Sequence, residues 1–219
     1  MNGLAPKTSE LFEAVSRLEC IKPFVLVGGT ALSLQLNHRQ SEDLDFMKWK
    51  AHADDPLDVG WHLIKKELEG IGKIESMELY GFDMVEFVIS DVKLSFYAAP
   101  RKRIPSMHDF LILNNLRIAD KKSIGAMKME VLLRRAKFRD YYDIYSIVKD
   151  GVDINEMMTM ALEHSNHVLK RKNLMALLTN GELFSRDQNI VHLNPFYQVT
   201  AFDIQEYFKA VLQKDKHAQ

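Results

Sequence analysis

The sequence contains a single cysteine, Cys20, among its 219 residues. One cysteine excludes a disulfide within the chain and any metal site built from several cysteines, and low cysteine use is typical of a reducing compartment. No stretch approaches the ~18–20 consecutive apolar residues of a membrane-spanning helix, and the first ten residues lack the apolar core of a signal peptide. We therefore expect a soluble cytoplasmic protein with no membrane partner.

The sequence also lacks an excess of either charge, with 29 Lys and Arg against 30 Asp and Glu. This balance argues against a general nucleic-acid coat protein, although it leaves room for a local basic patch. Hydrophobic residues make up 47% and charged residues 27%, values that are ordinary for a folded chain and exclude disorder as its main state. The length suits one large domain or two small ones.

Short runs of β-type residues lie in the first half of the chain, and helical patterns dominate the second. The apolar run 24–27 predicts a buried strand, and three later runs predict an antiparallel meander over residues 73–80, 82–89 and 92–98. Five helices are expected from residue 120 onward, over residues 120–136, 139–149, 154–163, 168–178 and 203–212. The pattern predicts an α+β architecture, with one domain over residues 1–119 and a helical C-terminal lobe over residues 120–219.

Two glycines, Gly28 and Gly29, follow the first predicted strand. Glycine lets the backbone turn tightly and lets a ligand approach it closely. The free N–H groups at the start of the next helix favour an anion such as phosphate. By itself a Gly-Gly pair is most often only a turn, with roughly one chance in ten of belonging to a catalytic site.

Asp43 and Asp45 lie two residues apart in a segment that alternates polar and apolar residues. In a strand this spacing directs both carboxylates to one side, with their Cα atoms ~6–7 Å apart. Mg²⁺ usually takes one or two protein carboxylates and keeps water and substrate phosphates as its other ligands. An Asp-x-Asp by itself is most often a solvated strand face. After a glycine turn, however, it supplies the minimal equipment for nucleotidyl or phosphoryl transfer.

The segment 28–46 resembles the first motif of the AbiEii/AbiGii toxin family, which are minimal nucleotidyltransferases of the DNA polymerase β-like superfamily. Residues 126–128, Arg135 and residues 137–145 resemble that family's later motifs, so the resemblance extends over about residues 24–148. It implies a polymerase β-like nucleotidyltransferase core with a mixed sheet. Family members are often the toxin of a toxin–antitoxin pair, so the resemblance also implies a cognate antitoxin as partner.

The resemblance implies a role for each matching residue of the first motif. Asp43 and Asp45 would be catalytic and would bind Mg²⁺ or Mn²⁺. Arg39 and Ser41 would shape the loop or contact phosphate. The triphosphate of the NTP substrate would be held by Gly28, Gly29 and Thr30.

The later motifs imply that Lys128 meets the nucleotide phosphates. Arg139, Asp140 and Asp143 would complete the site, with Asp140 acting as an acid, a base or a metal-orienting group. On a helix, Asp140 and Asp143 share one face because they are three residues apart. Judged without the first motif, a surface helix with charge pairs is the favoured interpretation by about two to one.

The sequence departs from the superfamily at Ser95, where a third carboxylate is expected. A neutral hydroxyl is a poor general base because its own proton is hard to remove, so activity could be reduced or lost. If Ser90-Asp91 forms a two-residue hairpin turn, Glu86 lies opposite Ser95 and could replace that carboxylate. A shift of one residue in register would move Glu86 to the other face.

Two weaker features are best explained by ordinary structure. His164 and His167 could share a helix face, but no third ligand is visible and a zinc site is improbable, at roughly one in twenty. The basic run 101–103 could contact an RNA acceptor, although a solvated loop is the better interpretation.

The favoured function is a Mg²⁺-dependent nucleotidyltransferase that moves an NMP from an NTP to RNA or another acceptor. One alternative is a non-catalytic module that binds nucleotide or a partner on the same fold, which the serine at position 95 favours. The other is a phosphotransferase that modifies a protein.

Overall fold

The computed structural model describes residues 2–52, 54–102, 104–165 and 168–214. The chain divides into two compact units, Met1–Asp120 and Lys121–Gln219. The boundary lies one residue after the position at which the sequence changes from strand-rich to helical patterns.

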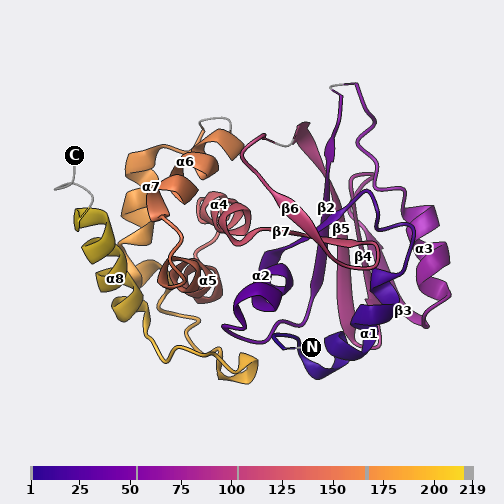
Figure 1. Ribbon diagram of the computed structural model, residues 1–219, viewed down its shortest axis with the longest axis horizontal. Coiled ribbons are helices and arrows are strands. Elements are labelled where there is room, and N and C mark those ends of the chain that lie inside the picture. The colour runs from indigo at the N-terminus through magenta and orange to yellow at the C-terminus, as the bar shows by residue number, and fades with distance from the viewer. Residues whose placement is uncertain (1, 53, 103, 166–167, 215–219) are drawn as a thin grey trace. The chain divides into compact units, whose positions relative to one another are not determined.

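The first unit contains a seven-stranded mixed sheet with strand order β3-β4-β5-β2-β1-β7-β6 (Figure 1). Its strands are β1 (Val25–Val27), β2 (Leu44–Lys50), β3 (Ile74–Leu79), β4 (Met84–Ile89), β5 (Val92–Lys102), β6 (Asp109–Leu113) and β7 (Leu116–Ala119). β2 pairs antiparallel with β1 and parallel with β5. The predicted α+β fold with a mixed sheet is confirmed.

The helices of the first unit are α1 (Pro6–Ser16), α2 (Gly28–Leu36) and α3 (Trp61–Glu69). α2 packs against β1 and β2, and α1 packs against β5. α2 starts directly after β1, at the glycine pair, and ends at Leu36; Asn37 after it adopts the left-handed conformation with φ 49°. The strand–glycine–helix order predicted from the sequence is therefore present.

One face of the sheet forms the core of the first unit. Leu44 and Phe46 on β2 are buried, whereas Asp45 between them is only half-buried. Phe46 stacks on Phe96 of β5, with ring centroids 4.9 Å apart, and Phe24 meets Phe96 edge-on at 5.3 Å. Since side chains alternate along a strand, burial of these apolar residues directs Asp45 to the opposite face.

The meander is present, and two strands beyond it were missed. β4 and β5 are joined by a two-residue turn, Ser90-Asp91, as predicted. β5, however, continues through Pro100 to Lys102, and β6 and β7 form a further hairpin around Asn114. Asn114 has φ 47°, a conformation that asparagine tolerates better than most residues. The asparagine was therefore a signal in the sequence from which this turn could have been predicted.

The second unit is helical, as predicted. It contains α4 (Lys121–Val131), α5 (Phe138–Lys149), α6 (Ile154–His164), α7 (Arg171–Leu178), α8 (Ala201–Lys214) and the short 3₁₀ helices η1 (Gly181–Phe184) and η2 (Val191–Leu193). Its core includes Tyr141 of α5, which stacks on Phe184 with ring centroids 3.6 Å apart. α4 ends five residues before the predicted end at 136, because residues 132–137 form turns and loop before α5.

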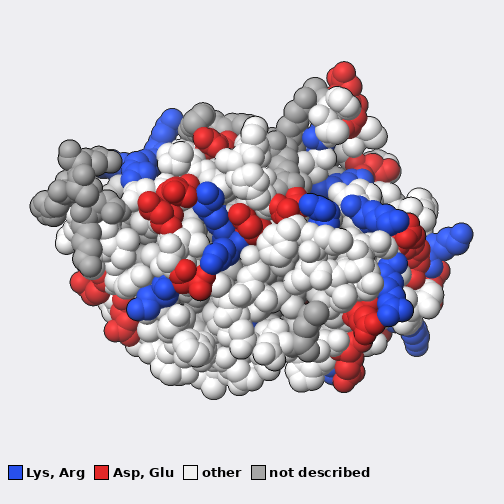
Figure 2. All heavy atoms as spheres, viewed as in Figure 1, with Lys and Arg blue, Asp and Glu red and all other residues white. Residues whose placement is uncertain are grey.

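In the described part of the chain, no helix is both long enough and apolar enough to cross a membrane. On the face shown in Figure 2, acidic and basic side chains are interspersed. The surface in view therefore carries no broad field of a single charge, in keeping with the formal net charge of −1.

Candidate functional site

The glycine pair and the acid pair lie next to each other in the first unit. Val27, the last residue of β1, pairs with Asp45 of β2. Gly28 follows with φ +69°, a conformation that favours glycine, and a Cβ added there would lie 2.7 Å from Asp45 Oδ2. The bare backbone of Gly28 therefore leaves the space that the Asp45 carboxylate occupies.

Gly29 lies next to two other predicted site residues, Arg39 and Ser41. A Cβ at Gly29 would lie 2.5 Å from Arg39 Nη2 and 3.0 Å from Ser41 Oγ. The Arg39 side chain is buried, and its Nη1 donates a hydrogen bond to the carbonyl of Gln40 at 2.8 Å. Arg39 and Ser41 thus reach the start of α2 from the loop that connects α2 to β2.

Thr30 fastens that loop to α2. Its hydroxyl lies 2.9 Å from Ser41 Oγ and donates to the carbonyl of Asp43. Thr30 is only 1% exposed, so both partners of its hydroxyl are groups of the protein. In this structure Thr30 holds the residues around it in place, and contact with a triphosphate stays a prediction.

The donor set suits a hard divalent cation bound together with phosphate. Asp45 lies in β2 and Asp43 lies one residue before its start, both half-buried, next to the free N–H groups at the start of α2. No group of three or more His, Cys, Asp or Glu residues that could hold a metal is present among the residues described. Mg²⁺ does not require such a group, because it commonly binds one or two carboxylates and completes its shell with water and substrate phosphates.

Ser95 lies beside Asp45 in the parallel pair β2–β5, and Glu86 lies directly opposite Ser95 in the antiparallel pair β4–β5. This is the register that the two-residue turn predicts. Ser95 Oγ donates to Glu86 Oε1 at 3.3 Å, so the Glu86 carboxylate reaches over the position where the third acid was expected. Glu86 is nevertheless two strands from Asp45, roughly 10 Å between Cα atoms.

Glu86 also has a neighbouring acid on β3. Glu78 is paired with it across the two strands, and the Tyr80 hydroxyl donates to Glu78 Oε2 at 2.5 Å and approaches Glu86 Oε2 at 3.4 Å. The hydrogen bond to Glu78 raises the pKa of Tyr80 to about 12. Tyr80 therefore keeps its proton and reduces the repulsion between two like charges on facing strands.

The second unit contains the other predicted cluster. Lys128 Nζ of α4 lies 3.1 Å from Asp140 Oδ1 and 2.7 Å from Asp143 Oδ2, both on α5. Arg135 adds two contacts to Asp140, from Nε at 3.0 Å and from Nη2 at 3.3 Å. Lys128, Asp140 and Asp143 are buried, and the charges of the two cations and two carboxylates balance.

Opposing effects set the charge state of Asp140. Burial by itself would raise the pKa of its carboxyl, but Lys128 and Arg135 outweigh burial, and the pKa lies below its ordinary value. Asp140 is therefore an anion at neutral pH. The sequence predicted Asp140 and Asp143 on one face of a helix, and their shared contact with Lys128 confirms it.

Arg135 and Arg139 occupy different environments. Arg135 was part of the recognised pattern but was not among the predicted site residues, although its position five residues before Asp140 is the signal that could have identified it. Arg139 is half-buried, and in the described part of the structure no hydrogen bond or ion pair engages its side chain.

Seven predicted residues thus gather in the first unit and three in the second. The first group is Gly28, Gly29, Thr30, Arg39, Ser41, Asp43 and Asp45, and the second is Lys128, Asp140 and Asp143. Of the weaker features, His167 and Arg103 lie outside the described residues. His164 Nδ1 lies 3.3 Å from Glu130 Oε2, and Glu130 is also the partner of Arg134.

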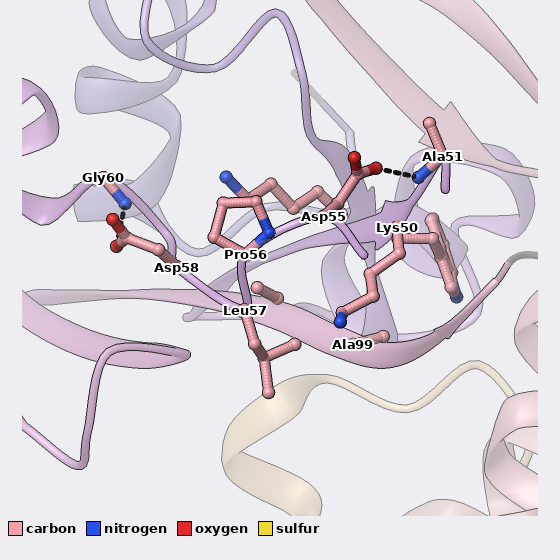
Figure 3. A pocket seen from close by; sticks show the side chains of 11 residues that line it. Lys50, Ala51, Asp55, Pro56, Leu57, Asp58, Gly60 and Ala99 are labelled. Carbon is pink, nitrogen blue, oxygen red and sulfur yellow. Dashed lines mark hydrogen bonds between the residues drawn. The ribbon is translucent and has the colours of Figure 1, made fainter. Parts of the chain in front are cut away.

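Figure 3 shows a pocket of about 380 Å³. It lies at the C-terminal end of β2, whereas the acid pair lies at the start of that strand. Its walls include Lys48, Trp49 and Lys50 of β2, the loop through Asp55 and Asp58, and two small residues of β5. Asp55 accepts hydrogen bonds from the backbone N–H of Ala51 and His52, and Asp58 accepts one from Gly60. None of the predicted site residues lines this pocket.

The comparisons with known proteins agree with this arrangement. Residues 10–215 match the family model described as nucleotidyl transferase AbiEii toxin, Type IV TA system. An uncharacterized protein of Aquifex aeolicus (strain VF5) is 24% identical over 216 residues, which are 95% of this chain and 96% of that protein.

Two solved structures share the fold. A candidate nucleotidyltransferase from H. pylori aligns with TM-score 0.59 and 19% identity, covering 96% of both chains. The nucleotidyltransferase toxin MenT4 from Mycobacterium tuberculosis H37Rv aligns with TM-score 0.57 and 16% identity, covering 94% of this chain and 84% of that one. The fold is that of nucleotidyltransferases, and the chain belongs to the AbiEii nucleotidyltransferase toxin family.

Proposed function

We propose that the protein transfers an NMP from an NTP to RNA, using Mg²⁺ or Mn²⁺, and that it is the toxin of a toxin–antitoxin pair. The observation that carries the proposal is the convergence of Gly28, Asp45, Arg39 and Ser41 at the start of α2. This arrangement combines backbone N–H groups, a guanidinium and carboxylates within one small region, which is what a metal-bound polyphosphate requires.

The triphosphate would lie at the start of α2. The helix N-terminus favours negative charge, and the bare backbone at Gly28 and Gly29 allows a phosphate to approach. Arg39, held against Gly29, places a permanent positive charge at this point. In the second unit, Asp140 and Asp143 hold Lys128 in a fixed position.

Asp43 and Asp45 would hold the divalent cation. When bound, the ion neutralises charge on the phosphates and polarises the α-phosphoryl group. Thr30 and Ser41 fix the backbone that leads into Asp43, so the two carboxylates are held in place before substrate arrives.

The reaction is an in-line displacement at the α-phosphorus. A bond forms from an acceptor hydroxyl oxygen to the α-phosphorus, the bond to the β-phosphate oxygen breaks, and pyrophosphate leaves. Since pyrophosphate would leave on the side of α2, the acceptor would approach from the opposite side, over Ser95 and Glu86. The acceptor proton would pass to water or to Glu86, because the Ser95 hydroxyl is a poor base.

Two further proposals concern the setting of the reaction. The family description places its members in Type IV toxin–antitoxin systems, and we propose a cognate antitoxin as protein partner. We place the protein in the cytoplasm, where both NTP and RNA are present. The alternatives are a module that binds nucleotide or a partner without turnover, which Ser95 favours, and a phosphotransferase that acts on a protein.

Incubation of the purified protein with total RNA and each of the four NTPs, labelled at the α- or the γ-phosphate, tests the reaction. We expect label from the α-phosphate in RNA, none from the γ-phosphate, and loss of at least about 100-fold of the transfer in Asp43→Asn. Asp54→Asn is the control, because it makes the same change in charge at an exposed position of the same unit.

Each alternative has its own result in that experiment. Label from the γ-phosphate on a protein acceptor would establish the phosphotransferase. Nucleotide binding without transfer of either label would establish the non-catalytic module.

Glu86 is tested separately through metal affinity. Its carboxylate must leave Ser95 and turn toward Asp45 to serve as a ligand, so Glu86→Gln is expected to weaken Mn²⁺ binding in the presence of a non-hydrolysable NTP analogue. Glu78→Gln is the matched control on the neighbouring strand. An unchanged Mn²⁺ affinity in Glu86→Gln would reject Glu86 as the replacement carboxylate.

A further inference from the structure

The loop between α2 and β2 carries Arg39, Ser41 and Asp43 but contains almost no regular structure of its own. Its conformation therefore depends on what holds it from outside. Residues 3–5, which we call the strap, run alongside it, and Leu4 forms an isolated parallel bridge with Ser41. The strap has no counterpart in the motif that the sequence revealed.

The strap satisfies both backbone polar groups of Ser41. The Ser41 N–H donates to the carbonyl of Gly3 at 3.0 Å, and the Ser41 carbonyl accepts from the N–H of Ala5 at 3.0 Å. Leu4, between them, is buried at 4% exposure and anchors the strap in the core of the first unit.

The strap also touches the helix that begins at the glycine pair. Gly3 has φ +82°, and a Cβ added there would lie 2.3 Å from the backbone oxygen of Ser33 in α2. No side chain fits at this point. The strap therefore contacts α2 on one side and Ser41 on the other, joining the two parts of the proposed phosphate site.

Three consecutive carbonyls of the loop are held by three different elements. The Ser41 carbonyl accepts from Ala5 of the strap, the Glu42 carbonyl accepts from Thr8 Oγ1 of α1 at 2.6 Å, and the Asp43 carbonyl accepts from Thr30 Oγ1 of α2. Because each carbonyl is fixed separately, the chain that enters β2 cannot slide or rotate without breaking several hydrogen bonds at once.

We propose that the strap is a positioning element for the reaction: it fixes the loop so that Arg39 and Asp43 face the start of α2, and it thereby sets the affinity for metal-bound polyphosphate. The inference rests on the proposed function, because it concerns the same site. Neither Gly3 nor Ala5 would touch the substrate. Their effect passes through the backbone of Ser41.

Ala5→Pro breaks one contact between the strap and the loop. Ala5 has φ −64°, which proline adopts without strain, and Leu4 before it forms a β-bridge and is not helical. The substitution removes the N–H that bonds to Ser41 and sets the ring Cδ against the Ser41 carbonyl, so it breaks the contact between the strap and the loop at this point. Ala5→Ser keeps the N–H and is its control.

Gly3→Ala and Gly60→Ala form a second matched pair. Both glycines have positive φ, +82° and +74°, so both alanines introduce backbone strain. Only the alanine at Gly3 meets another part of the protein, since nothing lies within 4 Å of a Cβ at Gly60. The pair separates general strain from contact between the strap and α2.

Two measurements on the full chain test the proposal. Calorimetric binding of inorganic tripolyphosphate with Mg²⁺ should weaken by at least about tenfold in Ala5→Pro and Gly3→Ala, and should stay unchanged in both controls. Amide hydrogen exchange at Ser41, Glu42 and Asp43 should become faster in the same two variants, while exchange in β4 stays unchanged.

A purely structural role predicts another result. Faster exchange at Ser41 with unchanged tripolyphosphate affinity would overturn the proposal, and so would unchanged exchange in both strap variants. If the wild-type protein binds neither tripolyphosphate nor NTP, the proposed function is rejected instead. The exchange measurement then still decides whether the strap orders the loop.

Discussion

At the scale of one residue, Gly28 shows how a missing side chain leaves space for a functional group. Its positive φ turns the chain from β1 into α2, and the missing Cβ leaves space for the Asp45 carboxylate. The sequence identified the glycine pair as a turn that admits a ligand. The structure shows that a Cβ added at Gly28 would meet the Asp45 carboxylate itself.

Gly28→Ala should reduce nucleotide transfer by at least about 100-fold, because the new methyl group displaces the Asp45 carboxylate. It should also lower the free energy of unfolding by about 1–2 kcal/mol through strain at positive φ. Gly60→Ala carries similar strain in open space and should lose stability only. Transfer assays and urea unfolding of both variants check this, and equal activities would contradict it.

The ion cluster around Asp140 has a defined pH dependence. The folded-state pKa of Asp140 is depressed, so its contribution to stability is complete above the unfolded pKa of about 3.9 and is lost as the pH falls through the folded value. At pH 7, Asp140→Asn should lower the free energy of unfolding by about 1–3 kcal/mol, because Arg135 loses its partner and Lys128 keeps only Asp143.

Urea unfolding of Asp140→Asn at pH 7 and pH 3, followed by far-UV circular dichroism, measures this effect. The difference from wild type should shrink at the lower pH. Asp187→Asn, at an exposed position of the same unit, is the control and should show little effect at either pH. A difference that stays constant with pH would contradict the role of the Asp140 charge.

At the scale of elements, the register of the β4–β5 hairpin determines which residues of β4 lie beside Ser95 and the acid pair. Its turn has φ 52° at Ser90 and φ 59° at Asp91, the conformation of a type I′ turn. A turn of this length fixes the register, and the register places Glu86 opposite Ser95. The residues at the turn are nevertheless poor choices for positive φ, because both have a Cβ.

Asp91→Gly should therefore stabilise the first unit relative to Asp91→Ala by about 1 kcal/mol, since glycine adopts positive φ without strain. Both variants lose the exposed ion pair with Lys7, so the comparison isolates the backbone effect. The midpoints of urea unfolding, followed by tryptophan fluorescence, check the order. Equal midpoints would mean that the turn is unstrained.

At the scale of the whole molecule, the chain consists of two compact units. Both tryptophans, Trp49 and Trp61, lie in the first unit, whereas most of the helices lie in the second. Tryptophan fluorescence therefore follows the first unit, and far-UV circular dichroism is weighted toward the second. Proteins with separate cores commonly depart from two-state unfolding.

We expect the two signals to give different urea transitions. Phe138→Ala, in the core of the second unit, should lower the free energy of unfolding measured by circular dichroism by about 3–5 kcal/mol. The free energy of unfolding measured by fluorescence should stay unchanged. Phe87→Ala, in the core of the first unit, should do the reverse. Coincident transitions in wild type and both variants would show one cooperative unit.

The sequence by itself determined the class of fold, the motif and most of the helices, because local spacing is enough to specify them. Gly28 next to an apolar run, and Asp43 and Asp45 two residues apart, predict a turn and a shared face without knowledge of distant contacts. The missed hairpin of β6 and β7 is different. Its segments are short, and β7 becomes a strand by pairing with β1, more than 80 residues earlier in the chain.

Only the tertiary structure decided which groups hold the predicted residues in place. No pattern in the sequence shows that Gly3 and Ala5 satisfy Ser41, or that Arg135 shares Asp140 with Lys128. These contacts join residues from separate elements, and their formation depends on packing that brings those elements together. Local spacing determines which side chains share a face, whereas the fold as a whole determines what that face meets.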